Sequence, residues 1–196
     1  NTHQRIMNAL AMGILFQPKS IILTDKLISH LNQKELLAVT SHEFGHHKYW
    51  HIPFLIITLV CTLVWSTKVL VLLGFDVSSG YEYVLQLMLV VGAIVGVSRQ
   101  FEEQADAYSI TNLSLSQGSE VITQDAANAM TNALETIAQT HSINADTNDP
   151  LHGSIQSRKS KLQSLVGCHL LEIPINKKVK KIKIALLIIM FVGFVV

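Results

Sequence analysis

Charged residues are scarce in this chain of 196 residues, and cysteines are scarcer still. Only 15% of the residues are charged while 49% are hydrophobic, a balance that is low in charge and high in apolar residues for a soluble domain. The net charge of +1 gives no electrostatic basis for nucleic-acid binding, so we expect no nucleic-acid partner. The two cysteines, Cys61 and Cys168, provide no disulfide framework. Cys61 lies in an apolar run and is interpreted as a small buried hydrophobe.

No signal peptide is visible at the start of the chain. The first residue is Asn1, and the last, Val196, lies inside an apolar run. We therefore expect a piece of a longer protein, with a single domain at this length.

What the chain does contain is a cluster of metal-binding residue types, His42-Glu43-Phe44-Gly45-His46, which has the form HExxH. Residues four apart share one face of a helix, so His42 and His46 can point at one metal ion. Glu43 is placed to reach a metal-bound water rather than the metal. Zinc held by two imidazoles and one carboxylate keeps a position open for water and lowers the pKa of that water to about 7. The spacing therefore predicts a zinc hydrolase.

The residues around this motif favour a metal site over the alternative, a surface helix that carries two histidines and a glutamate by accident. Residues 32–35, Asn-Gln-Lys-Glu, are typical of a helix N-cap with an acidic residue at the third helical position. No helix breaker follows before His42. A second cluster, Glu102-Glu103-Gln104-Ala105-Asp106, offers Glu102 or Glu103 as a third ligand on another expected helix.

Three apolar segments are candidates for membrane insertion: residues 52–73, residues 81–97, and a third that begins at Ile184. About 20 helical residues suffice to cross the hydrocarbon core. Pro53 is tolerable because a helix can restart there, and Lys68 is expected to snorkel to the interface.

A polar turn at residues 74–80 joins the first two segments into a helical hairpin. The alternative is a pair of buried helices in a soluble core, but residues 54–64 are apolar nearly all round, whereas a soluble helix normally keeps one polar face. An out-and-back hairpin would also return Glu102 to the side of His46.

Basic residues set the expected orientation of the hairpin. Lys48 and Arg99 flank its outer ends, whereas its turn carries Asp76 and Glu82 and no basic residue; five lysines between positions 177 and 183 precede the third segment. Positive charge stays on the cytoplasmic side, so we expect an integral, multi-pass membrane protein with its metal clusters at the cytosolic face. The lysine run could instead be solvated or bind anionic lipid.

The remaining segments are assigned from local patterns. Residues 20–24 form a β-type run, apolar residues from Ala126 to Ala138 recur at helical spacing as core packing, and residues 154–165 form a short helix that carries Arg158. We expect five consecutive parts: the first half of the catalytic domain (1–51), the transmembrane hairpin (52–97), the second half of the catalytic domain (98–170), a basic linker (171–183) and a truncated transmembrane helix (184–196).

Together these pieces resemble the membrane-embedded zinc endopeptidases that include the heat-shock protease HtpX and the CAAX prenyl endopeptidases. A transmembrane pair between two metal motifs is also characteristic of that group. The matching residues occur in the family's order and cover about residues 8–165: Asn8-Ala9 with Gly13, the HExxH cluster, Ser98-Arg99 with Glu102, Ala105 and Asp106, and His152 with Ser154 and Arg158.

The resemblance implies a mainly α fold with a small β-sheet, that is, an α+β zincin-like catalytic domain interrupted by a transmembrane helical hairpin. It implies that His42, His46 and Glu102 ligate one Zn²⁺ per chain. Glu43 would act as general base and then as proton donor to the leaving amine. Asp106, one turn beyond Glu102, would orient a ligand histidine.

The same resemblance gives roles to residues outside the metal motifs. Only Glu102, not Glu103, fits its E-x-x-A-D spacing. His152 and Arg158 would assist the tetrahedral intermediate or the structure of the site, although Gly153 stands where a proline often follows that histidine. An extended polypeptide substrate, expected to be membrane-associated, would add as a strand to a backbone edge; the residues assigned to that edge are Asn8, Ala9, Gly13, Ile21 and Ile22.

Several bland alternatives accompany these assignments. A non-hydrolytic zinc-stabilised membrane sensor or scaffold is the first, but structural zinc sites tend to have four protein ligands, and Glu43 has no purpose in one. The second is a soluble metalloprotease with buried apolar runs. Arg99 is interpreted as a possible cytosolic anchor. His47 and His51 are expected to be interfacial or solvated, and no role is assigned to His3, His30, His141 or His169.

Overall fold

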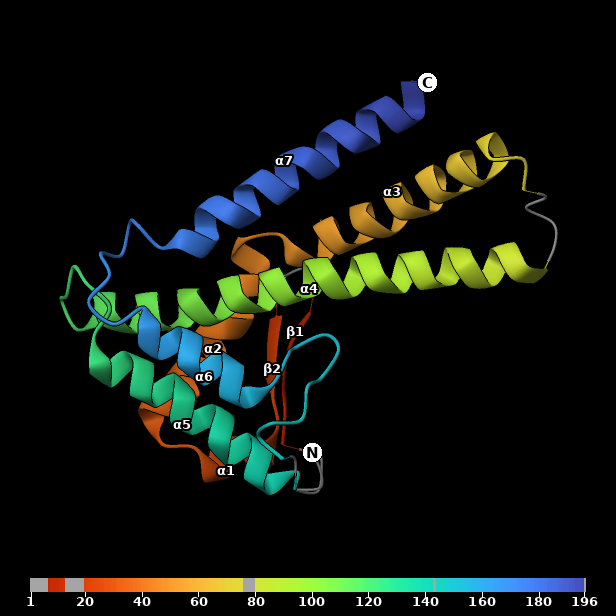
Figure 1. Ribbon diagram of the computed structural model, residues 1–196. Coiled ribbons are helices and arrows are strands. Elements are labelled where there is room, and N and C mark those ends of the chain that lie inside the picture. The colour runs from red at the N-terminus through yellow and green to blue at the C-terminus, as the bar shows by residue number, and fades with distance from the viewer. Residues whose placement is uncertain (1–6, 13–19, 76–79, 143, 196) are drawn as a thin grey trace.

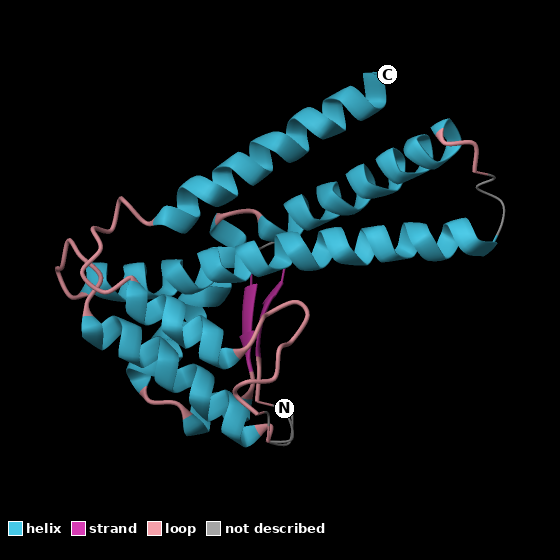
Figure 2. Cartoon of the chain, viewed as in Figure 1, coloured by secondary structure: helices cyan, strands magenta, loops and turns pink. Residues whose placement is uncertain are grey.

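The computed structural model describes residues 7–12, 20–75, 80–142 and 144–195. Helices dominate, and one small antiparallel sheet accompanies them (Figure 2). The expected fold class, mainly α with a small β-sheet, is thereby confirmed. The elements in chain order are β1 (Ala9–Met12), β2 (Ser20–Leu23), α1 (Asp25–His30), α2 (Gln33–Lys48), α3 (His51–Leu72), α4 (Gly80–Ser116), α5 (Gln124–Thr140), α6 (Ile155–Ser164) and α7 (Pro174–Val195).

Helix α2 begins as its sequence predicts. The Asn32 side chain accepts hydrogen bonds from the backbone N–H groups of Lys34 and Glu35, and the Glu35 side chain accepts one from the Asn32 N–H. This reciprocal capping box satisfies N–H groups that have no partner within the helix. The helix ends before Trp50, whose left-handed φ of 57° turns the chain into α3.

Helices α3 and α4 extend side by side away from the remainder of the molecule, and α7 runs out in the same direction (Figure 1). In the described part of the chain, α3 and α4 are long and apolar enough to cross a membrane. Only 22% of the apolar window of α3 and 6% of that of α4 is buried. This exposure does not fit the alternative of two buried helices in a soluble core.

Helix α7 packs along α3 through side chains of α3 that reach its backbone. Trp65 Nε1 donates to the Ile189 carbonyl over 3.0 Å, and Lys68 Nζ donates to the Gly193 carbonyl over 2.9 Å. Lys68, expected to snorkel, therefore has a protein acceptor. Cys61 is buried as expected. The lysine-rich segment expected as a linker is helical from Pro174 onward, because lysine is a good helix former and no breaker interrupts it.

The core lies between the C-terminal half of α4, helices α2, α5 and α6, and the start of α7. The helical stripe predicted from Ala126 to Ala138 supplies its α5 side, and Phe101 and Ile110 supply the α4 side. Strand β1 packs against α2. This arrangement places the two metal motifs face to face and sets a strand beside them.

Candidate active site

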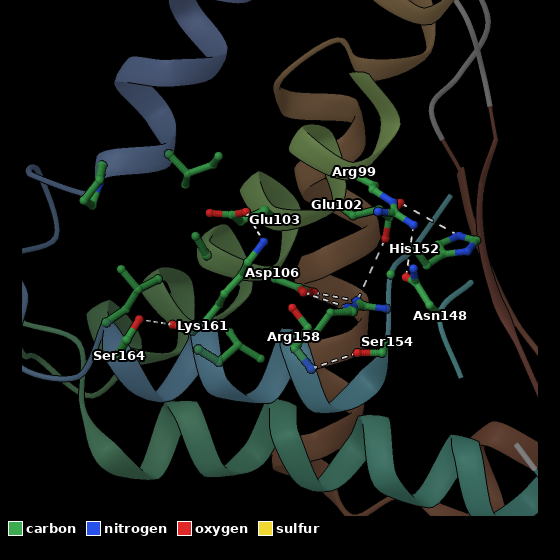
Figure 3. Close-up of a pocket in the computed structure, with 17 residues that line it drawn as sticks. Arg99, Glu102, Glu103, Asp106, Asn148, His152, Ser154, Arg158, Lys161 and Ser164 are labelled. Atoms are coloured by element: carbon green, nitrogen blue, oxygen red, sulfur yellow. Dashed lines mark hydrogen bonds and ion pairs between the residues drawn. The ribbon is translucent and has the colours of Figure 1, made fainter. Parts of the chain in front are cut away.

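The two metal motifs meet where α2 crosses α4. His42 Nε2 lies 3.5 Å from one oxygen of Glu102, and His46 Nε2 lies 3.4 Å from the other. The two Nε2 atoms are 3.2 Å apart, and the three potential ligand atoms lie within 4.8 Å of one another. The hairpin thus returns Glu102 to the two histidines. Glu103, the other carboxylate considered, is turned away toward Lys161 (Figure 3).

Gly45 allows the two helices to approach this closely. A Cβ atom at position 45 would lie 3.3 Å from Ala105 Cα and 3.2 Å from Tyr108 Cδ1. Those contacts are tight, and the backbone atom of Ala105 cannot move away like the end of a flexible side chain. A small residue between the two histidines therefore sets the distance from α2 to Glu102.

Behind His42 lies a buried ion pair. His42 Nδ1 is 2.9 Å from Asp106 Oδ1, and Arg158 of α6 points at the same carboxylate (Figure 3). Arg158 donates from Nε and from a terminal nitrogen to the two oxygens of Asp106 over 2.8 and 2.6 Å. Such a two-pronged arginine–carboxylate pair fixes geometry as well as charge. The terminal guanidinium nitrogen also lies 3.9 Å from Glu102.

The charges of this cluster favour a single proton on the histidine pair. Burial alone would lower the pKa of His42, but the Asp106 and Glu102 carboxylates outweigh it and raise that pKa to about 10. Burial and the positive His42 lower the pKa of His46 to about 4. For Glu102, burial is outweighed by His42, His46 and Arg158, which lower its pKa to about 2. In the absence of a metal, the protonated ring of His42 is thus a cation between the carboxylates of Glu102 and Asp106.

This donor set fits a metal ion. Two imidazole nitrogens and a carboxylate oxygen converge on one buried point, and the cluster already stabilises positive charge there. Two His and one Glu are a ligand set that zinc takes in catalytic sites, with a further position left for water.

The side chain of Glu43, next to His42 in sequence, contacts strand β1. Its Oε2 accepts a 2.9 Å hydrogen bond from the backbone N–H of Ala11. Next to β2, the Thr24 N–H donates to the Asn8 carbonyl. The alternation of antiparallel pairing then turns the N–H groups of Ala9 and Ala11 away from β2. The Ala9 N–H is bonded by the Asn8 side chain. The free edge of β1 is therefore the edge beside Glu43.

The other residues expected at this edge lie elsewhere. Ile21 and Ile22 pair with Ala11 and Leu10 on the opposite side of β1, so they support the edge without forming it. Gly13 lies outside the described residues.

His152 lies at the mouth of the cluster, in a loop that the side chains of Asp149 and Arg99 hold in place. Its Nε2 lies 4.0 Å from Glu102 Oε1, and its Nδ1 lies 2.9 Å from Asp149 Oδ1. Gly153 has a φ of +77° and donates its N–H to the Asp149 carbonyl, a conformation that proline, with φ fixed near −65°, cannot adopt. The glycine that departs from the family pattern is therefore the residue this turn requires.

The sequence does not indicate that Arg99 and Asp149 hold the His152 loop in place. Arg99, interpreted from sequence as a possible cytosolic anchor, donates to the Pro150 carbonyl over 2.9 Å and to Asn148 Oδ1 over 3.0 Å. It thereby ties α4 to the His152 loop. A cavity of about 300 Å³ opens between this loop, α4 and α6, and its lining includes Arg99, Glu102, His152 and Arg158 (Figure 3).

The expectation that His47 and His51 are interfacial or solvated is wrong. His47 is 5% exposed and His51 is fully buried. His51 lies against Phe101 and contacts both His46 and Gln104. Helical spacing could not place it, because the left-handed turn at Trp50 separates it from α2.

Comparison with known proteins identifies similar sequences. A CAAX prenyl protease 1 homologue of Dictyostelium discoideum is 53% identical over 45 residues, which are 23% of this chain and 10% of that protein. No solved structure matches the chain. The profile of peptidase family M48 matches residues 2–146, a range that includes both metal motifs and ends before His152. The chain therefore belongs to peptidase family M48, whose members are metal-dependent peptidases.

Proposed function

We propose that this chain is the catalytic part of a membrane-bound zinc metalloendopeptidase whose active site faces the cytosol. The observation that carries the proposal is the convergence of His42, His46 and Glu102 on one buried point, with Glu43 next to His42 in sequence. These three side chains would hold one Zn²⁺. When bound, zinc would polarise the scissile carbonyl and lower the pKa of water at the site to about 7.

Glu43 is the proton carrier of this proposal. Its carboxylate would accept a proton from the attacking water and deliver it to the nitrogen of the leaving amine. The Ala11 N–H orients that carboxylate through Oε2. A general base held in place needs less reorganisation when the substrate arrives.

His152 would stabilise the tetrahedral oxyanion from outside the ligand set. Its imidazole is half-exposed and lies 4.0 Å from Glu102, so it borders the place where a substrate carbonyl would lie. Asp149 Oδ1 accepts hydrogen bonds from the backbone N–H and from Nδ1 of His152, and these bonds orient the ring. Donors positioned toward a developing oxyanion lower the barrier of acyl transfer. Arg158, which is buried against Asp106, is assigned to the structure of the site and not to substrate.

The substrate is proposed to be a membrane-associated polypeptide bound in extended form along β1. The outward backbone groups of Ala9 and Ala11 would pair with its main chain, and such pairing tolerates varied side chains. Quality control of membrane proteins and processing of a membrane-bound partner both fit this mode of binding.

The membrane orientation rests on charge. Lys48 and Arg99 flank the outer ends of the α3–α4 pair, and the lysine run opens α7. Basic residues remain on the cytoplasmic side, which supports a cytosolic site. Release of the protein by carbonate washing without detergent would contradict the integral-membrane arrangement.

The test of the function compares wild type with Glu43→Gln after purification in detergent. We expect stoichiometric zinc in both proteins and casein cleavage by the wild type alone, because the amide keeps the shape of the side chain but cannot take a proton. Full activity of Glu43→Gln would sink the mechanism. Zinc in both with cleavage by neither would favour a zinc-stabilised sensor.

A further inference from the structure

A line of hydrogen bonds leads from the rear of His46 across three more helices. His46 Nδ1 lies 3.0 Å from His51 Nδ1. His51 Nε2 lies 3.0 Å from Gln104 Oε1. The Gln104 amide nitrogen donates to Asn176 Oδ1 over 2.9 Å. The four residues belong to α2, α3, α4 and α7, so the line connects the metal motif to the start of α7.

A metal on His46 would give this line a single direction. A ligating Nε2 carries no proton, so the neutral ring of His46 must carry its proton on Nδ1. That N–H can only donate, and His51 Nδ1 must accept it. The His51 proton then lies on Nε2, where the oxygen of Gln104 accepts it. Each donor has an acceptor in this arrangement.

Packing holds the middle of the line in place. His51 is fully buried and Gln104 is 3% exposed. The His51 ring stacks on Phe101 with centroids 4.4 Å apart and planes 4° from parallel. Buried imidazole and amide groups are costly unless hydrogen-bonded, so this geometry resists rearrangement.

We propose that His51 is a positioning residue for the metal: its Nδ1 fixes the tautomer and orientation of His46, while Gln104 and Asn176 hold His51 in the accepting form. The inference rests on the proposed zinc function. It makes the two histidine ligands unequal, because His42 is backed by the anionic Asp106 and His46 by a neutral ring. It also makes the seating of α7 contribute to zinc affinity.

The experiment measures zinc affinity by competition with a chromophoric chelator, and the visible spectrum of the Co²⁺-loaded protein. His51→Phe keeps a ring on Phe101 but removes both nitrogens, and we expect zinc binding about 10- to 100-fold weaker and an altered Co²⁺ spectrum. His51→Gln can accept from His46 and donate to Gln104, so it should restore most of the affinity. His141→Phe is the matched control, since His141 bonds the Met7 carbonyl away from the metal site.

Wild-type zinc affinity and an unchanged Co²⁺ spectrum in His51→Phe would overturn the inference. Where that variant does not fold, Gln104→Met removes the acceptor behind His51 together with the donor to Asn176, and it should weaken zinc binding several-fold; unchanged affinity there also overturns the inference. A wild-type protein that binds no zinc would instead refute the proposed function. Zinc bound equally by wild type and His51→Phe would refute only the role of His51.

Discussion

The carboxylate of Glu43 and the backbone of Ala11 are joined by a 2.9 Å hydrogen bond between Oε2 and N–H. The bond ties the proposed proton carrier to the strand proposed to bind substrate. A substrate carbonyl that pairs with the edge of β1 needs the donor that Glu43 now occupies. Substrate addition and the position of the base are therefore coupled through one N–H group.

Ala11→Pro tests this coupling. The substitution removes an N–H that faces away from β2, so the pairing of β1 with β2 should survive. One backbone hydrogen bond is worth about 1 kcal/mol, and we expect kcat/KM for a peptide to fall about five- to tenfold with zinc content unchanged. Leu10→Pro is the contrasting control. The Leu10 N–H faces β2, where Leu10 pairs with Ile22, so its removal should lower the melting temperature. Unaltered kcat/KM in Ala11→Pro would show that the N–H contributes nothing to turnover.

Arg158→Gln and Lys161→Gln form a matched pair on α6. Arg158 is buried and paired with Asp106, whereas Lys161 is half-exposed and paired with Glu103. Loss of one partner from a buried ion pair costs about 3–5 kcal/mol, while an exposed pair is worth about 1 kcal/mol or less. In detergent, the melting temperature should therefore fall strongly for Arg158→Gln and change little for Lys161→Gln. Equal melting temperatures would contradict the structural role of Arg158.

Gly153→Pro restores the residue often found in the family and should still impair this protein. The turn needs a φ of +77° and an N–H donor to Asp149, and proline offers neither. We expect kcat to fall with zinc affinity retained, because His152 loses its position. The double variant with His152→Ala should be no slower than His152→Ala alone. Additive losses in the double variant would mean that Gly153 acts independently of His152.

Zinc affinity should rise with pH. In the metal-free protein, Asp106 and Glu102 outweigh burial and raise the pKa of His42 to about 10, so the ring is protonated at neutral pH. Zinc must displace that proton, and the association constant should grow about tenfold per pH unit from pH 7 until it levels off near the raised pKa. Competition titrations at several pH values measure the slope. Asp106→Asn lowers the pKa of His42 and should flatten it; a wild-type constant independent of pH would contradict the proton on His42.

Local signals explain which features the sequence could predict. The capping box at Asn32 and Glu35, the four-residue spacing of His42 and His46, and the apolar stripe of α5 depend on residues close in sequence, and the structure contains each of them. The return of Glu102 required only that a hairpin lead out and back.

The features that escaped prediction depend on contacts between distant segments. The burial of His51 depends on Phe101 and Gln104 of another helix, and the turn at Trp50 erased the periodicity that would have suggested it. The hydrogen bonds from Arg99 of α4 to Asn148 and Pro150 of the His152 loop likewise join distant segments. The pattern of residues along one sequence does not indicate such contacts between distant segments.

The unbroken course of α4 from Gly80 to Ser116 has a mechanical consequence. Glu102 lies five residues beyond the apolar stretch that ends at Val97, roughly 7–8 Å along the axis at 1.5 Å per residue. In the proposed arrangement, α4 has no break between its lipid-embedded half and the half that carries Glu102. In that arrangement a bilayer whose thickness does not match the hairpin would tilt such a helix and would move the carboxylate of Glu102 relative to His42 and His46. Lipid acyl-chain length would thus reach the metal site through one rigid rod.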